Sequence, residues 1–190
     1  KEFDVCREKQ IPHRLFAKYG LDHVVPFKHE AIDDWRDSLR KGLMVRYDDS
    51  NIILSGGVDD IWFDTQTEEL IVVDYKSQAS NYEVNPSSYL SSPYHEAYKI
   101  QMDFYNYLLN LMGFKTGLIS YFLVVNADRH AEGFHGEMKF SETLIPYKHD
   151  FSWIDHEVNN MIDCLNSDKL PESHISCENC AYAKQRNSIE

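Results

Sequence analysis

The spacing of hydrophobic positions along the chain predicts three amphipathic helices. In segment 95–112 hydrophobic side chains recur every three or four residues, which is the period of a helix with one buried face. Gly113 follows this segment and suits the end of a helix. The same spacing appears less regularly in 29–41 and 151–165. We therefore expect helices in all three segments, with the longest at 95–112.

Shorter hydrophobic runs predict β-strands between these helices. Three runs, at 43–47, 52–63 and 70–76, follow the first predicted helix and are separated by polar, turn-forming residues, as in an antiparallel meander. A fourth run, at 117–127, is hydrophobic at almost every position, which is typical of a strand buried on both faces. The remaining segments are predicted to be an irregular loop (77–94) and a further strand or hairpin (134–145).

The resulting order, αβββαβ, indicates an α/β fold with a mixed central sheet flanked by helices. The length of 190 residues and a hydrophobic content of 43% fit one domain with a sizeable core. We expect a single domain over 1–190, with its core at about 29–127 and a C-terminal strand, helix and cysteine-containing tail at 128–190. No hydrophobic run is long enough to span a membrane and no signal peptide is apparent, so we expect no membrane association and a cytoplasmic location.

The charge balance limits how the chain could bind a polyanion. There are 31 acidic and 19 basic side chains, which gives a formal net charge of −12. Proteins that bind nucleic acid mainly by neutralising phosphates usually carry a basic surplus. Any contact with nucleic acid must therefore be local, use divalent cations or depend on a partner.

Charged residues at the ends of two predicted strands are the first candidates for chemistry. Asp74 and Lys76 share one face of their strand because alternate residues point the same way. Asp59 and Asp60 point to opposite faces of the neighbouring strand, so the hairpin can bring one of them to Asp74. We expect Asp74 and Lys76 to project beyond the core. A salt bridge between the strands is the simple alternative, since surface ion pairs are common.

Two carboxylates and a lysine at strand ends also suit metal-assisted hydrolysis of phosphodiesters. Carboxylates supply oxygen ligands for Mg²⁺ or Mn²⁺, and a lysine can orient water or balance developing charge. Gln101 lies on the hydrophobic stripe of the helix at 95–112, and Tyr105 follows one turn later on the same face. This amide and this phenol can face the strand ends, although Gln101 could instead satisfy a backbone group at the edge of the stripe.

These motifs, taken in order, resemble those of the PD-(D/E)XK nuclease superfamily and, within it, of the RecB-like branch. The matching segments are Gly56-Gly57-Val58-Asp59, then Asp74-Tyr75-Lys76, then Gln101-x-x-x-Tyr105. The resemblance implies a restriction-endonuclease-like αβββαβ core and Mg²⁺ or Mn²⁺ as cofactor. The implied roles are metal binding by Asp59, Asp74 and the Tyr75 backbone carbonyl, charge stabilisation by Lys76, and positioning of the lysine or the nucleic acid by Gln101 and Tyr105.

The resemblance implies further ligands less directly. Many relatives add a His or Glu from the helix before the meander, where Glu30 is the best-placed candidate and His29 the next. Asp60 is the substitute for Asp59 if the strand faces differ from our assignment. No motif identifies which of these residues would be the additional metal ligand.

The tail carries a second candidate metal site. Cys177-x-x-Cys180 resembles the end of RecB-like and CRISPR-associated nucleases, which hold an iron–sulfur cluster with one early and three late cysteines. Cys6 could be the early ligand, but Arg186 stands where the last thiolate belongs, so we expect no intact cluster. The alternatives are a structural Zn²⁺ held by Cys6, Cys177, Cys180 and His174, or plain thiols.

The sequence therefore predicts a metal-dependent deoxyribonuclease that hydrolyses phosphodiester bonds, as an exonuclease in DNA repair, recombination or defence. Its partners would be single-stranded DNA or duplex ends, with a protein partner in such a complex as a further option. The alternatives are a nuclease fold that binds nucleic acid without cutting it and a zinc-stapled interaction protein. The residues expected to contact DNA locally are Lys76, Lys99 and Arg129, with Tyr82, Tyr89 and Tyr94 stacking on unpaired bases.

Overall fold

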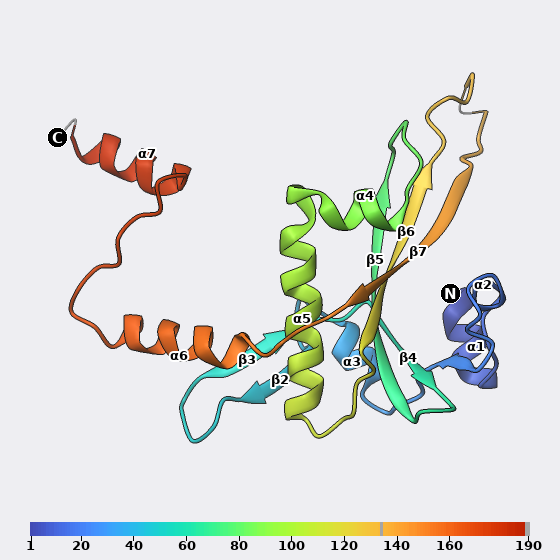
Figure 1. Ribbon diagram of the computed structural model, residues 1–190, viewed down its shortest axis with the longest axis horizontal. Coiled ribbons are helices and arrows are strands. Elements are labelled where there is room, and N and C mark those ends of the chain that lie inside the picture. Colours follow the sequence, from blue (N-terminus) through green and yellow to red (C-terminus); the bar gives the residue numbers. More distant parts are fainter. Residues whose placement is uncertain (134, 189–190) are drawn as a thin grey trace. The chain divides into compact units, whose positions relative to one another are not determined.

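A computed structural model describes residues 1–133 and 135–188 of the chain. Its contacts form two compact units, Lys1–Phe151 and a C-terminal unit that begins at Ser152. The first unit is built on a five-stranded sheet, of which β4, β5, β6 and β7 are labelled in Figure 1. The expectation of an α/β fold with a mixed central sheet is confirmed.

The strands of this sheet lie in the order β1-β4-β5-β6-β7. Only β5 and β6 pair in parallel, with Asp74 opposite Phe122 and Lys76 opposite Val124, and the other neighbours are antiparallel. A parallel pair requires a crossover connection, which the long helix α5 provides. The bounds are β1 (Val24–Pro26), β4 (Asp60–Asp64), β5 (Glu69–Gln78), β6 (Ile119–Ala127) and β7 (Phe140–Lys148).

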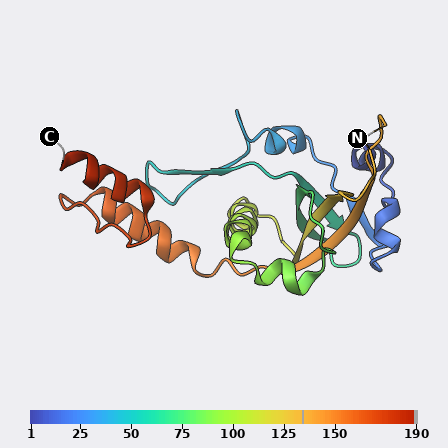
Figure 2. The same cartoon turned by 90° about the horizontal axis from the view of Figure 1, so that it is seen from above.

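Helices cover both faces of the sheet, as Figure 2 shows from above. On one face α5 (Glu96–Leu111) packs Met102 and Leu108 into a core with the inward residues of β4, β5 and β6. On the other face α1 (Glu2–Lys9) and α2 (Arg14–Ala17) cover a second core, where Phe16 packs against Trp62. The burial of β5 and β6 on both faces explains their nearly continuous hydrophobic sequence.

The predicted strand at 52–63 is divided between two sheets. β2 (Leu43–Arg46) and β3 (Ile53–Gly56) form a separate antiparallel hairpin that packs on α5, and β4 begins only at Asp60. The division falls at Gly57, where an added Cβ would overlap Ser38. The chain can therefore change sheets at this point only with a residue that has no side chain.

Two predicted elements differ in extent. The helix expected at 29–41 is reduced to α3 (Ile32–Arg36), and Leu39, one of the hydrophobic positions that predicted the longer helix, is 92% exposed. The loop expected at 77–94 contains helix α4 (Pro86–Ser91) and the 3-10 helix η1 (Pro93–His95). Asn85 caps α4 by accepting a hydrogen bond from the Ser88 N–H at 3.0 Å, a start signal that the pattern of hydrophobic positions does not contain.

The C-terminal unit contains α6 (Ile154–Leu165), close to the expected helix, and α7 (Glu178–Asn187), which the sequence pattern did not predict. Strand β7 begins at Phe140, later than the expected start at residue 134, and residue 134 itself lies outside the described residues. None of the helices in the described segments combines the length and the apolar character that crossing a membrane requires.

Candidate active site

The C-terminal end of β5 carries an ion pair on the face covered by α5. Strand β4 begins at Asp60, which pairs with Val73, so the residues of β5 that follow Val73 have no partner in β4. Asp74 and Lys76 both follow it, and the Lys76 ammonium contacts the Asp74 carboxylate. Asp74 is only 2% exposed, so the expectation that it projects beyond the core is wrong. Burial raises the pKa of Tyr89 in α4 and of Tyr105 in α5, and the charge of Asp74 adds to both rises, so a phenol from each of these helices lies near it.

Asp59 joins this site from the segment that leads into β4. Its Oδ2 accepts a hydrogen bond from the backbone N–H of Tyr75 at 2.7 Å. The N–H and C=O of a strand residue project to the same side, so the Tyr75 carbonyl also faces the side of Asp59. Burial raises the pKa of Asp74 to about 6; the neighbouring charge of Asp59 adds to this rise, and Lys76 opposes it. The Asp59 carboxylate is thus close enough to influence the ionisation of Asp74.

Helix α5 holds the lysine in place through three side chains on one of its faces. Gln101 accepts a hydrogen bond from the Lys76 ammonium at 3.3 Å and donates one to the Tyr105 hydroxyl at 2.5 Å. The Lys76 ammonium also lies 4.4 Å from the centre of the Tyr98 ring, a cation–π contact. Tyr98 was not predicted, although its position three residues before Gln101 places it on the same helical face.

A glycine in the first motif lets this helix approach the sheet. A Cβ added at Gly56 would lie 2.8 Å from the Tyr105 ring, closer than such atoms can approach. Burial of the Tyr105 ring raises the pKa of its hydroxyl, and the charges of Asp74 and Asp59 act in the same direction. The phenol therefore remains protonated at neutral pH.

Asp60 lies on the opposite face of the sheet and has a different environment. Its side chain is fully buried, and its two oxygens are contacted by the Arg7 guanidinium and by the Tyr75 hydroxyl, the latter at 2.6 Å. Because both oxygens are engaged on the face away from α5, this geometry disfavours Asp60 as a substitute for Asp59. The alternation that separated the two acids in the sequence is seen in the structure.

The ion pairs on this second face also include an arginine that contacts the backbone of Asp59. Arg36 donates from Nε to the Asp59 backbone carbonyl and from a terminal nitrogen to Asp4, each at 2.9 Å. Asp4 also pairs with Arg7, which contacts Asp60. Tyr75 links the two acids as well, because its hydroxyl donates a hydrogen bond to Asp60 and its backbone N–H donates one to Asp59. Sequence reasoning missed Arg7, Asp4 and Arg36, because ion pairs between distant segments leave no periodic signal.

The two candidates expected in the first helix, His29 and Glu30, lie just before α3. His29 stacks on Trp35, with ring centres 4.4 Å apart, and accepts a hydrogen bond from the Ala31 N–H. Glu30 is exposed, and the structure gives neither residue a contact with Asp59 or Asp74. Their role as metal ligands stays a prediction.

The donor set at this site is small. In residues 1–133 and 135–188, no three His, Cys, Asp or Glu side chains group closely enough to hold a metal ion by themselves. Two carboxylates and a backbone carbonyl remain, from Asp59, Asp74 and Tyr75. Mg²⁺ often binds through one or two carboxylates and keeps waters and substrate phosphates as its other ligands. The residues present therefore fit a divalent cation of this kind.

The candidate ligands of the tail belong to different units. Cys6 lies in the first unit, whereas His174, Cys177 and Cys180 line a pocket of about 330 Å³ in the second. Cys177 accepts a hydrogen bond from the Cys180 N–H at 3.4 Å, and this contact at the start of α7 lowers the pKa of the Cys177 thiol. The shared structural metal site stays a prediction.

Comparison with known proteins gives one family. The family model of the PD-(D/E)XK nuclease superfamily matches residues 5–185, which is most of the chain and includes Asp59, Asp74, Lys76, Gln101 and Tyr105. Searches of curated proteins and of solved structures find no match.

Proposed function

Because the chain belongs to the PD-(D/E)XK nuclease superfamily, we propose that it is an active nuclease that hydrolyses DNA phosphodiester bonds with Mg²⁺ or Mn²⁺. One observation carries the proposal most strongly. The buried carboxylate of Asp74 lies beside a second acid and a single lysine, an excess of negative charge that a divalent cation would balance. Strongly perturbed acids at the end of a strand are typical of functional sites.

Each residue of the site has a distinct role in this proposal. Asp59, Asp74 and the Tyr75 carbonyl would hold the cation. A bound Mg²⁺ or Mn²⁺ would polarise the phosphate and lower the pKa of a bound water. Lys76 directs a fixed positive charge to the same place, where it can stabilise negative charge that develops on the phosphate. Gln101 fixes the position of that ammonium.

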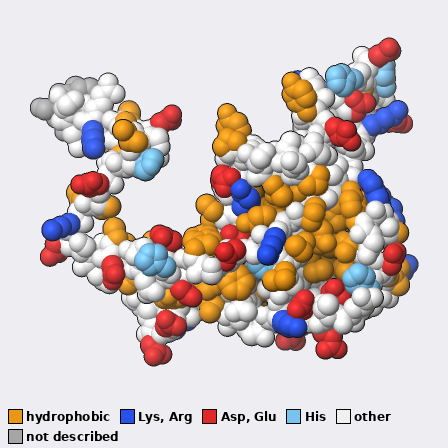
Figure 3. Space-filling view, viewed as in Figure 1, with side chains coloured by type: hydrophobic (Ala, Val, Ile, Leu, Met, Phe, Trp, Pro, Cys, Tyr) orange, Lys and Arg blue, Asp and Glu red, His pale blue; other side chains and the backbone are white. Residues whose placement is uncertain are grey.

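The distribution of charge on the surface bears on the kind of DNA that would be the substrate. Figure 3 shows Lys and Arg side chains scattered among acidic and hydrophobic ones on the viewed face, without one broad basic area. Together with the net charge of −12, this favours a small contact area such as a strand end over a long duplex track. We therefore propose exonuclease action on DNA ends, in the manner of the RecB-like branch.

The test uses end-labelled single-stranded DNA, duplex DNA and RNA of one sequence, each with Mn²⁺ or with EDTA. We expect the wild-type protein to cleave DNA only when Mn²⁺ is present. Asp74→Asn and Lys76→Ala should each lower the rate by about 100-fold or more, the scale for loss of one charge-stabilising group. Products that shorten from one end would identify an exonuclease.

The matched control is Glu69→Gln, which removes a carboxylate at the opposite end of the same strand, where it pairs with Lys115. This variant should cleave at the wild-type rate. Wild-type protein that leaves all three substrates intact with Mn²⁺ would contradict the proposed activity. Cleavage by Lys76→Ala at the wild-type rate would show that the activity resides elsewhere.

A further inference from the structure

An open pocket of about 500 Å³ lies on the same face of the sheet as the candidate active site, one step further along β5. Gln78 lines it and points to the same face as Lys76, because the two residues alternate along the strand. The His95 ring at its base stacks on Tyr98, with ring centres 5.3 Å apart, and Tyr98 in turn contacts the Lys76 ammonium. The pocket is thus connected to the proposed catalytic lysine through two rings.

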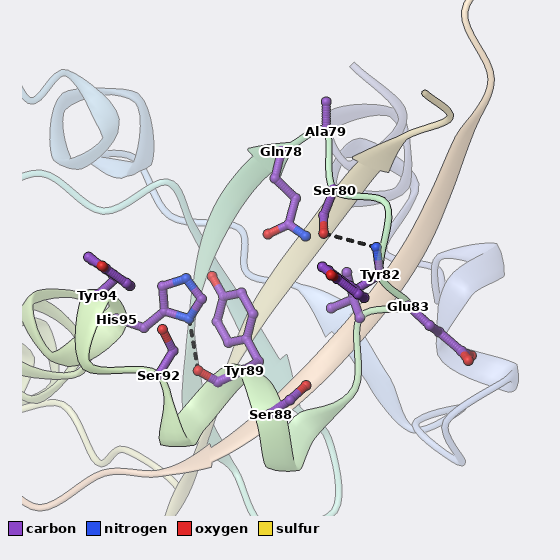
Figure 4. Close-up of a pocket in the computed structure, with 11 residues that line it drawn as sticks. Gln78, Ala79, Ser80, Tyr82, Glu83, Ser88, Tyr89, Ser92, Tyr94 and His95 are labelled. Atoms are coloured by element: carbon purple, nitrogen blue, oxygen red, sulfur yellow. Dashed lines mark hydrogen bonds between the residues drawn. The ribbon is translucent and has the colours of Figure 1, made fainter. Parts of the chain in front are cut away.

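Four aromatic rings line this pocket among smaller and polar side chains, as Figure 4 shows. The rings of Tyr89 and His95 lie together at its centre, 4.0 Å apart, with Tyr82 and Tyr94 on opposite sides of them. Tyr89 is buried, at 5% exposure, so the expectation that it stacks on bases from the surface is wrong. It forms the floor instead, whereas Tyr82 and Tyr94 are 84% and 87% exposed.

The polar groups of the pocket indicate a neutral, planar ligand. Its described lining contains Glu83 as the one charged side chain and neither Lys nor Arg, so a phosphate would find no cation there. His95 donates from Nδ1 to the Tyr89 carbonyl at 2.8 Å, which leaves its other ring nitrogen for a ligand. The Gln78 amide offers both a donor and an acceptor. Rings for stacking and a few hydrogen-bonding groups at the edge match what an unpaired nucleobase requires.

We infer that this pocket binds an unpaired nucleobase of single-stranded DNA next to the phosphate that is cleaved. This inference rests on the proposed nuclease function and adds a preference for single strands or frayed ends. Bases of the strand would stack on both Tyr94 and Tyr82, and the edge of one base would reach Gln78. A base inside an intact duplex could not enter, since it remains stacked and paired with its neighbours.

Binding measurements test the pocket separately from cleavage. Fluorescence anisotropy of a labelled oligothymidine, and of a blunt hairpin duplex, is recorded in EDTA so that no cleavage occurs. Tyr94→Ala and Tyr82→Ala should each weaken binding of the oligothymidine by about 5- to 100-fold, the usual effect of removing one stacking ring. Binding of the hairpin should change less than about 2-fold. Both side chains are exposed, so the folded structure should tolerate these substitutions.

Two matched variants sharpen the test. Tyr94→Phe keeps the ring and should bind like the wild type, and Tyr182→Ala removes an exposed tyrosine in α7, outside the pocket, with no expected effect. Equal binding of oligothymidine by Tyr94→Ala, Tyr82→Ala and the wild type would overturn the inference, as would an equal loss for the hairpin. Selective loss of oligothymidine binding in a protein that never cleaves would support the pocket while contradicting the nuclease.

Discussion

Each face of the sheet buries a carboxylate where the start of β4 meets the C-terminal part of β5, but the two faces balance the negative charge differently. On the face covered by α1, Asp60 is contacted by the Arg7 guanidinium and the Tyr75 hydroxyl, and Arg7 is shared with Asp4. On the face covered by α5, Asp74 has one lysine as its counter-charge and a second acid, Asp59, beside it. The negative charge is balanced on the α1 face, whereas the α5 face carries an excess of negative charge.

This difference separates a structural site from a functional one. A buried carboxylate is costly unless its charge is paired, so folding alone favours the arrangement around Asp60. The arrangement around Asp74 raises that residue's pKa and is unfavourable for the isolated chain. Such a shortage of positive charge is typical of sites that bind a ligand. The α5 face is therefore where we expect the cation and the substrate.

The largest effect on stability should follow from removing the ion pair between Arg7 and Asp60. Arg7→Ala leaves Asp60 buried without its cation, and we expect the free energy of unfolding to fall by about 3 to 5 kcal/mol. Urea denaturation measures this. The control is Lys28→Ala, which removes an exposed pair with Glu8 and should change the free energy by about 0.5 kcal/mol or less. Equal effects of the two substitutions would show that the Arg7 pair is not structural.

The two adjacent acids give the next largest contrast. Asp59→Asn should lower the cleavage rate by about 100-fold, as loss of a metal ligand does, with little change in stability. Asp60→Asn should instead lower the free energy of unfolding while the rate per folded molecule stays near that of the wild type. Rates normalised to the folded fraction from circular dichroism separate the two effects. Equal loss of rate in both variants would contradict the division of roles between the faces.

The strongest periodic signals in the sequence predicted the parts that position the site. The stripe of α5 and the nearly continuous hydrophobic run of β6 were long enough to identify these elements. The three motifs lie in order between the end of β3 and the start of β4, on β5 and on α5. The N-terminal elements α1, α2 and β1 were not predicted, because they are short and their hydrophobic positions do not repeat. The position of Asp60 did indicate a buried cationic partner, since an acid within a buried strand requires one. Nothing in the pattern indicated that Arg7 would supply it.

The charge deficit itself can be tested by neutralising Asp74. Its pKa is raised to about 6 from a usual 3.8, so between pH 4 and 6 the folded chain retains a proton that the unfolded chain has lost. Stability therefore falls as the pH rises through this window. Asp74→Asn removes this cost and should raise the free energy of unfolding by about 1 to 3 kcal/mol at pH 8, measured in EDTA. At pH 4 the two proteins should be equally stable, and a variant less stable than the wild type at pH 8 would contradict the deficit.

The smallest expected effect comes from single hydroxyl groups, one on each face. Tyr105→Phe removes the oxygen that receives the Gln101 amide, so Lys76 is held less firmly. Loss of one hydrogen bond between neutral groups should lower the cleavage rate by about 2- to 10-fold, with stability nearly unchanged. The matched substitution, Tyr75→Phe, removes a hydrogen bond to the Asp60 carboxylate and should lower the free energy of unfolding by about 2 kcal/mol without changing the rate per folded molecule. If Tyr105→Phe loses stability and keeps its rate, Gln101 does not position the lysine, and the α5 face is organised by packing alone.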